Sequence, residues 1–196
     1  MSEIRIYQSF FKRPIDIIMS FSFLALLSPL LLMLAICIRL DSPGGVLFFQ
    51  RRIGCGGSVF VLVKLRTMLD RPRKVTGEIV GAHADVTSLG QWLRRFKLDE
   101  LPQLWNILRG DMSFVGPRPC LPEQVAELNE DGRWRLTVRP GLTGLAQVNG
   151  NIYLSWPQRW VFDKQYVHSV TLVGDVRILL KTFLVVLFGE YRLRSG

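Results

Sequence analysis

The feature that most constrains the fold of this chain is an uncharged apolar run at residues 17–38, IIMSFSFLALLSPLLLMLAICI. A helix that enters a bilayer needs about 20 apolar residues, so this run is long enough. It is long for the core of a secretory signal and has no small-residue cleavage pattern before Arg39, so we treat it as retained. Ser28 and Pro29 lie at its centre, where a proline bends or interrupts a helix.

The charges that flank this run leave its topology open. Lys12 and Arg13 precede the run, and Arg39 and Arg51 follow it, so the positive-inside bias selects no orientation. One reading is a kinked helix that spans the membrane once, since proline is tolerated there. The other is a helix that enters, breaks at Ser28-Pro29 and returns to the same face. The residues alone favour neither.

Composition limits the partners of the chain. Its 196 residues suit one domain besides the apolar run, and the formal net charge is +9. Such a balance fits nucleic acid, phospholipid headgroups or a phosphorylated substrate. We see no nucleic-acid motif and no interleaved aromatic and basic platform, so we expect no nucleic-acid partner. The three cysteines lack CxxC spacing, which predicts neither a disulfide framework nor a zinc site.

Residues 41–110 predict a hairpin, a loop and a helix in turn. Two β-rich runs, 46–54 and 58–68, are joined through the glycines of residues 54–57 and predict a hairpin. Residues 70–86 read as a polar loop, in which His83 is a weak catalytic candidate. Helical patterning begins at Thr87-Ser88 and ends at Gly110.

Two amphipathic stretches close the chain, at residues 156–167 and 169–189. One reading makes them core helices. The other lays them at a membrane interface with Trp156, Trp160, Arg177 and Lys181 as anchors. Both readings are compatible if they apply to different faces.

Asp99 and Glu100 stand directly before the apolar stripe of the predicted helix. A structural reading makes them a helix cap and a first-turn carboxylate. A functional reading follows from the basic residues just upstream, which include Arg94 and Lys97. One carboxylate would attack phosphorus while the other holds a divalent cation, because magnesium prefers few carboxylates together with substrate phosphates.

A stiff turn presents Arg118 between Pro117 and Pro119. Proline removes φ freedom, so this guanidinium can clamp a phosphate at low entropic cost. The segment around Arg139, followed by Pro140 and Gly141, repeats the device. Two rigid arginine turns in one small basic domain favour a polyanionic ligand.

These motifs together resemble the bacterial sugar transferase family, the monotopic phosphoglycosyl transferases that start glycan assembly on polyprenyl phosphate. The resemblance covers about residues 11–189 and matches the short form of these enzymes. The motifs that carry it, in order, are KRPIDI (12–17), Ser28-Pro29, QRRIG (50–54), KLRTM (64–68), KLDELPQLWNIL (97–108), GDMSFVGPRP (110–119) and VRPGLTGLAQVNG (138–150).

The resemblance implies a reaction at the cytoplasmic face of the bacterial inner membrane, in contact with its phospholipids. A UDP-sugar and undecaprenyl phosphate are the expected substrates. Asp99 matches the nucleophile, which takes up the phosphosugar and releases UMP, and Glu100 matches the ligand of Mg²⁺. The Ser28-Pro29 pair matches the break of a re-entrant helix.

Further positions carry over from the family as substrate-binding residues. Arg94, Arg118 and Arg139 match basic positions around the substrate phosphates, and Pro117 and Pro119 frame the nucleotide side. Lys64 and Arg66 belong to another matching motif whose individual roles are not assigned. The chain departs from the common pattern after Gly150, where it reads NIYLSW.

We therefore expect a helix-dominated α+β fold with a re-entrant helix–break–helix, a small β element and interfacial helices. Residues 1–40 would form the membrane segment and residues 41–196 the cytosolic catalytic domain. A noncatalytic membrane-bound assembly scaffold is the alternative function. The donor sugar and the oligomeric state stay open, a homodimer being one option.

Overall fold

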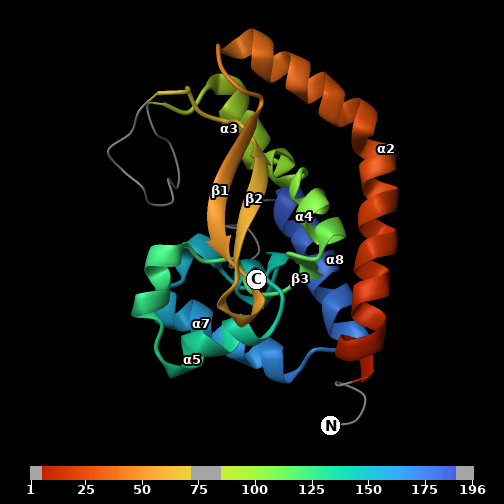
Figure 1. Cartoon of the computed structure of the whole chain (residues 1–196), viewed down its shortest axis with the longest axis vertical. Helices are drawn as coiled ribbons and strands as arrows, with labels where there is room; N and C mark the ends of the chain where they lie inside the picture. Colours follow the sequence, from red (N-terminus) through yellow and green to blue (C-terminus); the bar gives the residue numbers. More distant parts are fainter. Residues whose placement is uncertain (1–5, 72–84, 189–196) are drawn as a thin grey trace.

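The computed structural model describes residues 6–71 and 85–188 and has a helix-dominated α+β fold (Figure 1). The predicted fold class is confirmed, while His83 lies outside the described residues. The elements are η1 (Tyr7–Phe11), α2 (Lys12–Asp41), β1 (Leu47–Ile53), η2 (Cys55–Gly57), β2 (Val59–Leu65), α3 (Ser88–Arg95), η3 (Leu98–Glu100), α4 (Gln103–Arg109), β3 (Ser113–Val115), η4 (Pro122–Glu127), α5 (Glu130–Arg133), η5 (Trp134–Thr137), β4 (Gly141–Thr143), α6 (Leu145–Val148), η6 (Asn151–Tyr153), α7 (Trp156–His168) and α8 (Leu172–Phe188).

The long helix α2 touches the rest of the molecule near both ends. Near its start, the buried carboxylate of Asp16 accepts hydrogen bonds from Ser113 and from the backbone N–H of Phe114. Near its end, Leu34 and Ile38 are buried in a small apolar cluster that includes Leu65. Most of the apolar stretch between these ends is exposed, and residues 7–41 are long and apolar enough to cross a membrane.

Helix α2 bends in its middle but does not break (Figure 1). Pro29 lacks the N–H that would bond to the carbonyl oxygen of Ala25 four residues earlier. The hydroxyl of Ser28 donates to that oxygen instead, at 2.8 Å. The expected interruption at Ser28-Pro29 is therefore wrong, because the serine satisfies the carbonyl that the proline leaves and the helix continues through the pair.

The predicted hairpin is confirmed. Strands β1 and β2 pair antiparallel, with Leu47 opposite Leu65 and Ile53 opposite Val59. The connecting turn places Gly56 at φ 68° and Gly57 at φ 77°, in the left-handed region that favours glycine.

The helical segment that follows is also confirmed at its ends. Helix α3 begins at Ser88, where the Thr87 side chain accepts a hydrogen bond from the N–H of Gly90. Helix α4 ends at Gly110, which adopts φ 101° as its left-handed C-cap.

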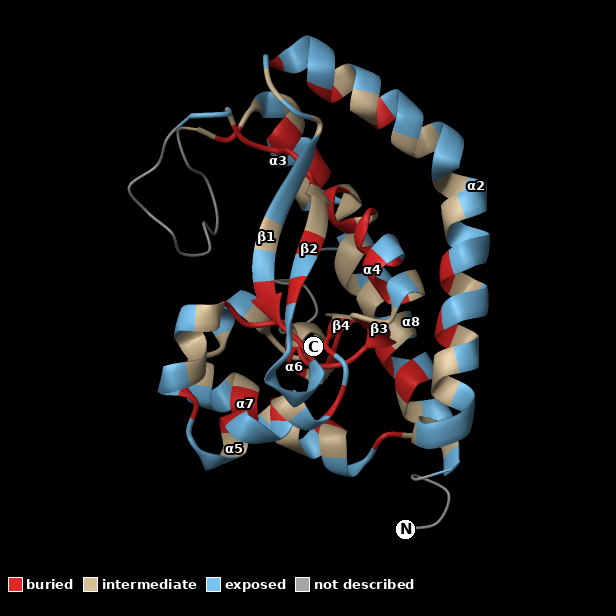
Figure 2. Ribbon diagram, viewed as in Figure 1, coloured by how far each residue is buried: buried red, intermediate tan, exposed pale blue. Residues whose placement is uncertain are grey.

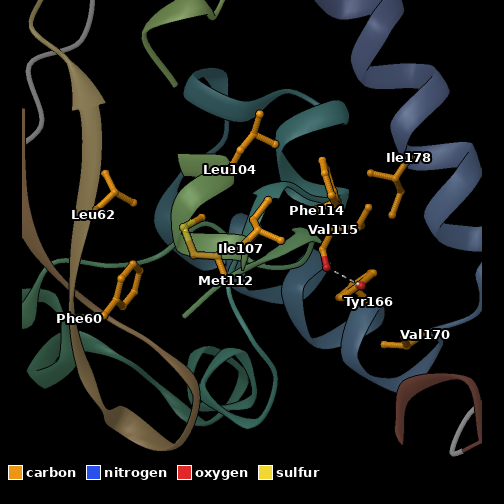
Figure 3. Packing of buried hydrophobic residues seen from close by; sticks show 10 residues of the cluster. All are labelled: Phe60, Leu62, Leu104, Ile107, Met112, Phe114, Val115, Tyr166, Val170 and Ile178. Carbon is orange, nitrogen blue, oxygen red and sulfur yellow. Dashed lines mark hydrogen bonds between the residues drawn. The ribbon is translucent and has the colours of Figure 1, made fainter. Parts of the chain in front are cut away.

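The main core lies where β2, α4, α7 and α8 meet (Figure 3). Ile107 and Met112 are fully buried there, and the Tyr166 hydroxyl donates to the carbonyl of Val115 at 2.9 Å. Strands β3 and β4 pair parallel beside this core, with Ser113 opposite Gly141. This short pair joins the two predicted arginine turns, although they are far apart in sequence.

Of the last two helices, α7 packs into the core and α8 has an exposed apolar face. Trp160 on α7 is buried and contributes to the core, so its expected role as an interfacial anchor is wrong. Helix α8 buries Ile178 inward and exposes Leu180 and Phe183 outward, and Arg177 and Lys181 are exposed as well (Figure 2). The exposed face of α8 is therefore apolar with basic residues, which is the composition of an interfacial helix.

Candidate active site

Asp99 and Glu100 lie in the short 3-10 turn η3, between α3 and α4. Lys97 begins this turn in the left-handed conformation, at φ 57°. Both carboxylates are buried, with exposures of 7% for Asp99 and 8% for Glu100. The N-cap of α4 is Pro102, and no side chain caps that helix, so helix capping does not explain the pair. Buried carboxylates need another reason to be there.

Glu100 is held by cations from two other elements. The Lys64 ammonium on β2 donates to its Oε1 at 2.9 Å, and the Arg118 guanidinium donates to the same oxygen at 3.3 and 3.2 Å. The folded chain thus brings together three residues that the sequence places in three separate motifs.

The charges around the pair set the two pKa values apart. Burial favours a higher pKa of Glu100, but the attraction of Lys64 and Arg118 outweighs it and holds that pKa well below its usual range. Burial, followed by repulsion from Glu100, raises the pKa of Asp99, while Lys64, Lys97 and Arg94 oppose the rise. Glu100 is therefore a fixed negative charge, and ionised Asp99 is more basic than an exposed aspartate.

Arg94 stands on α3 close to Asp99. Its Nε donates to the hydroxyl of Thr67 at 2.9 Å, and its charge acts on the Asp99 carboxyl. The sequence places Arg94 shortly before the carboxylate pair, and in the folded chain its charge lies near Asp99. The Thr67 contact fixes the guanidinium from the segment just after β2.

Burial and close packing against a neighbouring segment restrict the backbone of the Pro117-Arg118-Pro119 turn. Pro117 and Pro119 are buried, and Arg118 lies half-buried between them. A Cβ on Gly116 would lie 2.4 Å from the carbonyl oxygen of Arg139, so the two arginine turns need glycine to approach this closely.

The side chains of Arg139 and Arg66 make other contacts. The Arg139 backbone lies against the Pro117-Arg118-Pro119 turn, since the N–H of Gly141 donates to the carbonyl of Pro117 at 2.9 Å, whereas the Arg139 Nε donates to the carbonyl of Gly110 at 3.0 Å. Arg66 donates to the carbonyls of Ser42 at 2.6 Å and Pro43 at 2.9 Å, so it ties β2 to the chain just after α2. Arg66 also donates to the Ser42 hydroxyl at 3.0 Å, and among the described residues neither side chain has a hydrogen bond to Asp99 or Glu100.

A cavity of about 250 Å³ opens beside Glu100 and Arg118. Its other walls are largely apolar and come from β4, α6 and α8. Polar side chains that line it include Thr143, Gln147 and Asn151. Asn151 begins the segment in which the sequence departs from the family pattern, and its φ of 42° is unusual for a non-glycine residue.

Sequence reasoning missed Gln147 and the buried arginines behind the turn. Arg52 and Arg135 are 3% and 6% exposed and donate to carbonyls of the Pro117-Arg118-Pro119 turn. Arginine is seldom buried without a partner, but a sequence does not show burial. Arg52 lies in the QRRIG motif but received no role, and Arg135 lies in a basic segment that none of the quoted motifs covers.

Comparison with known proteins identifies the class to which this fold and site belong. Residues 7–189 match the family model described as bacterial sugar transferase. The chain therefore belongs to the bacterial sugar transferase family and is a phosphoglycosyl transferase enzyme.

Three relatives have names that state a pathway or an activity. The chain is 37% identical over 187 residues to the exopolysaccharide production protein ExoY of Rhizobium meliloti, covering 87% of this chain and 83% of that protein. It is 40% identical to the UDP-glucose:undecaprenyl-phosphate glucose-1-phosphate transferase of Caulobacter vibrioides, covering 87% of this chain and 67% of the relative. It is 36% identical to the undecaprenyl-phosphate galactose phosphotransferase of Salmonella typhimurium, and this match covers 91% of this chain but 40% of the relative.

Proposed function

We propose that this protein transfers a sugar 1-phosphate from a UDP-sugar to undecaprenyl phosphate through a covalent intermediate on Asp99. The observation that carries the proposal is the ionised Glu100, clamped by Lys64 and Arg118 next to buried Asp99 at the edge of a cavity. Relatives named as sugar phosphotransferases on undecaprenyl phosphate support the substrate classes. A noncatalytic scaffold has no use for such a costly buried charge cluster.

In the first step, a carboxylate oxygen of Asp99 bonds to the sugar-bearing phosphorus. The bond from that phosphorus to the bridging oxygen breaks, and the electron pair leaves with UMP. Arg118 and Arg94 are placed to bind the phosphate oxygens as negative charge redistributes over them. The raised pKa of Asp99 makes its ionised form a better base and hence a better nucleophile.

In the second step, an oxygen of undecaprenyl phosphate bonds to the same phosphorus. The bond between phosphorus and the Asp99 oxygen breaks, which restores the carboxylate. The product is a sugar linked to undecaprenyl diphosphate. This sequence needs no proton to enter or leave at Asp99.

The carboxylate pair fits a magnesium site of the kind that takes few protein ligands. No group of three or more acidic, His or Cys side chains that could hold a metal occurs in residues 6–71 and 85–188. Glu100, with Asp99 beside it, suits an ion that draws its remaining ligands from water and substrate phosphates. When bound, magnesium would neutralise charge on the diphosphate.

We place the reaction at the cytoplasmic face of the inner membrane. The exposed apolar stretch of α2 and the apolar outer face of α8 support membrane attachment. A re-entrant α2, bent at Ser28-Pro29, would leave both basic flanks in the cytoplasm. Cysteines introduced at positions 5 and 45, with Cys37, Cys55 and Cys120 replaced by serine, test this in intact cells. Gly45 has room for the change, since its nearest neighbouring atom lies 3.7 Å from a Cβ there. Labelling from opposite sides would mean a spanning helix.

Replacing Asp99 by Asn removes the nucleophile at nearly constant shape. We expect UMP release, with magnesium, undecaprenyl phosphate and a panel of UDP-sugars in nanodiscs, to disappear together with any trapped phosphosugar adduct. Asp131→Asn is the matched control, because Asp131 pairs with Lys164 at the surface, far from η3 in sequence. An adduct that still forms in Asp99→Asn would refute the assignment, and release of UDP would indicate ordinary glycosyl transfer.

Replacing Glu100 by Gln tests the magnesium proposal. The amide keeps the shape but lacks the charge, so we expect lower activity and a higher magnesium concentration for half-maximal UMP release. Glu130→Gln, an exposed change at the start of α5, is the control. An unchanged magnesium dependence in Glu100→Gln would count against Glu100 as a metal ligand.

A further inference from the structure

Two buried arginines hold the Pro117-Arg118-Pro119 turn from behind. Arg135 of η5 donates through Nη2 to the carbonyl oxygen of Arg118 at 2.7 Å. Arg52 of β1 donates through Nη1 to the carbonyl oxygen of Pro119 at 2.8 Å. Charged donors make stronger hydrogen bonds than neutral ones, so the backbone on which the Arg118 side chain stands is fixed at adjacent residues.

Asp163 of α7 forms an ion pair with Arg135. Its Oδ2 lies 3.3 Å from Arg135 Nη2 without the geometry of a hydrogen bond, and the two side chains are 3% and 4% exposed. An ion pair this deeply buried is costly to desolvate and is weak evidence for added stability. Its presence calls for an explanation other than stability.

The pair lies beside the catalytic cavity rather than in it. Asp163, Arg135, Arg52 and Arg118 line a small cavity of about 20 Å³, while neither Asp163 nor Arg135 lines the cavity of about 250 Å³ beside Glu100. The small cavity holds about one water molecule. Arg118, Gln147 and Asn151 line both cavities, and Arg118 accepts a hydrogen bond from Arg135 through its carbonyl oxygen.

We infer that Asp163 and Arg135 are positioning residues of this enzyme: through the carbonyl of Arg118 they aim its guanidinium at Glu100 and at the phosphates of the donor. The inference rests on the proposed function, in which Arg118 binds those phosphates. The chain of contacts runs from Asp163 to Arg135, from Arg135 to the Arg118 backbone, and from the Arg118 side chain to Glu100. A displacement of about 1 Å in such a clamp is enough to cost up to about 100-fold in rate.

The positioning depends on the charge of Asp163. Burial raises the pKa of Asp163 to about 6, although Arg135 and Arg159 lower it. The other ionisable groups lining the same cavity are Arg52, Arg118 and the thiol of Cys120. Asp163 is ionised and paired above this pH, and below it Arg135 loses its counter-charge. We therefore expect the pH profile of UMP release to show an acid limb near pH 6, caused by Asp163, which lies outside the catalytic cavity.

The decisive experiment is a double-mutant cycle between Asp163→Asn and Arg118→Ala, read as single-turnover UMP formation in nanodiscs. We expect Asp163→Asn to lower kcat/KM by about 10- to 100-fold in the wild-type background. In the Arg118→Ala background the same change should cost less than about twofold, because the side chain it positions is gone. Equal factors in both backgrounds would overturn the inference. Asp131→Asn is the control for an Asp change at an exposed ion pair.

Further measurements keep the inference testable if one variant folds poorly. Arg52→Met removes the donor to Pro119 and should show the same dependence on Arg118. The acid limb near pH 6 should be lost in Asp163→Asn, and its persistence would contradict the assignment. Failure of the proposed function looks different: the wild type would then release no UMP, and if only the role of Arg118 failed, Arg118→Ala would leave UMP release unchanged. An impaired Arg118→Ala with an additive Asp163→Asn refutes the positioning role alone.

Discussion

The buried Asp163 carboxylate should lower the stability of the protein while it serves the site. Its pKa is raised by burial from 3.8 to about 6, despite the attraction of Arg135 and Arg159. A pKa shift of about two units between the unfolded and folded states corresponds to about 3 kcal/mol in the free energy of unfolding. Because the pKa of Asp163 is higher in the folded state than in the unfolded state, protonated Asp163 favours folding. This stabilisation of about 3 kcal/mol is present below about pH 4 and is lost as the pH rises through about 6.

Asp163→Asn mimics the protonated form at every pH. We therefore expect the variant to match the wild type near pH 4 and to exceed it by up to about 3 kcal/mol at pH 7. For a chain of this size that is a rise in Tm of about 6–12 °C. Thermal unfolding followed by near-ultraviolet circular dichroism in nanodiscs, from pH 4 to 8, gives the difference directly. The other carboxylates are the same in both proteins, so their contributions cancel in the difference between the two Tm values.

Two results would refute this reasoning. A Tm difference that does not change with pH would mean that Asp163 does not titrate in this range. A variant less stable than the wild type at pH 7 would mean that the attraction of Arg135 outweighs the burial of the carboxylate. A more stable but slower Asp163→Asn enzyme is the combination that the structure predicts.

Other changes test the cluster and the turn. Lys64→Met removes the cation that most lowers the pKa of Glu100, so that pKa should rise towards its usual range in a carboxylate NMR titration; an unchanged pKa of Glu100 would contradict the electrostatic account. Gly116→Ala forces a Cβ to within 2.4 Å of the Arg139 carbonyl, so it should separate the β3–β4 pair, lower Tm by several degrees and reduce activity, whereas a wild-type Tm would show that the turns have more freedom than the structure gives them.

The sequence predicts the local elements of this fold well, because their signals are local. The hairpin follows from alternating β-rich runs around glycines, and Thr87 and Gly110 act as the cap residues that their types favour. At Pro29 the residues alone left a kinked continuous helix and a broken one open, and the family resemblance favoured the break. The helix continues there, and the Ser28 hydroxyl donates to the carbonyl of Ala25 that the proline leaves without its N–H partner.

The candidate site is less predictable, because its contacts are long-range. Asp99 and Glu100 could be selected from their residue types and neighbours, but the family resemblance was needed to prefer chemistry over helix capping. That Lys64 and Arg118 both reach Glu100, while the Arg139 side chain reaches the carbonyl of Gly110, depends on the pairing of distant segments. Burial of Arg52, Arg135 and Asp163 is likewise a property of the packed molecule.

The end of β2 adds a link between α2 and the carboxylates, besides the contacts of Asp16, Leu34 and Ile38. Lys64 donates to Glu100, and two residues later Arg66 donates to the backbone just after α2. Two residues of extended chain span about 7 Å. If α2 lies in lipid as proposed, this short segment fixes the distance of Glu100 from the end of α2, so a change in the depth of that end would move the carboxylate with it.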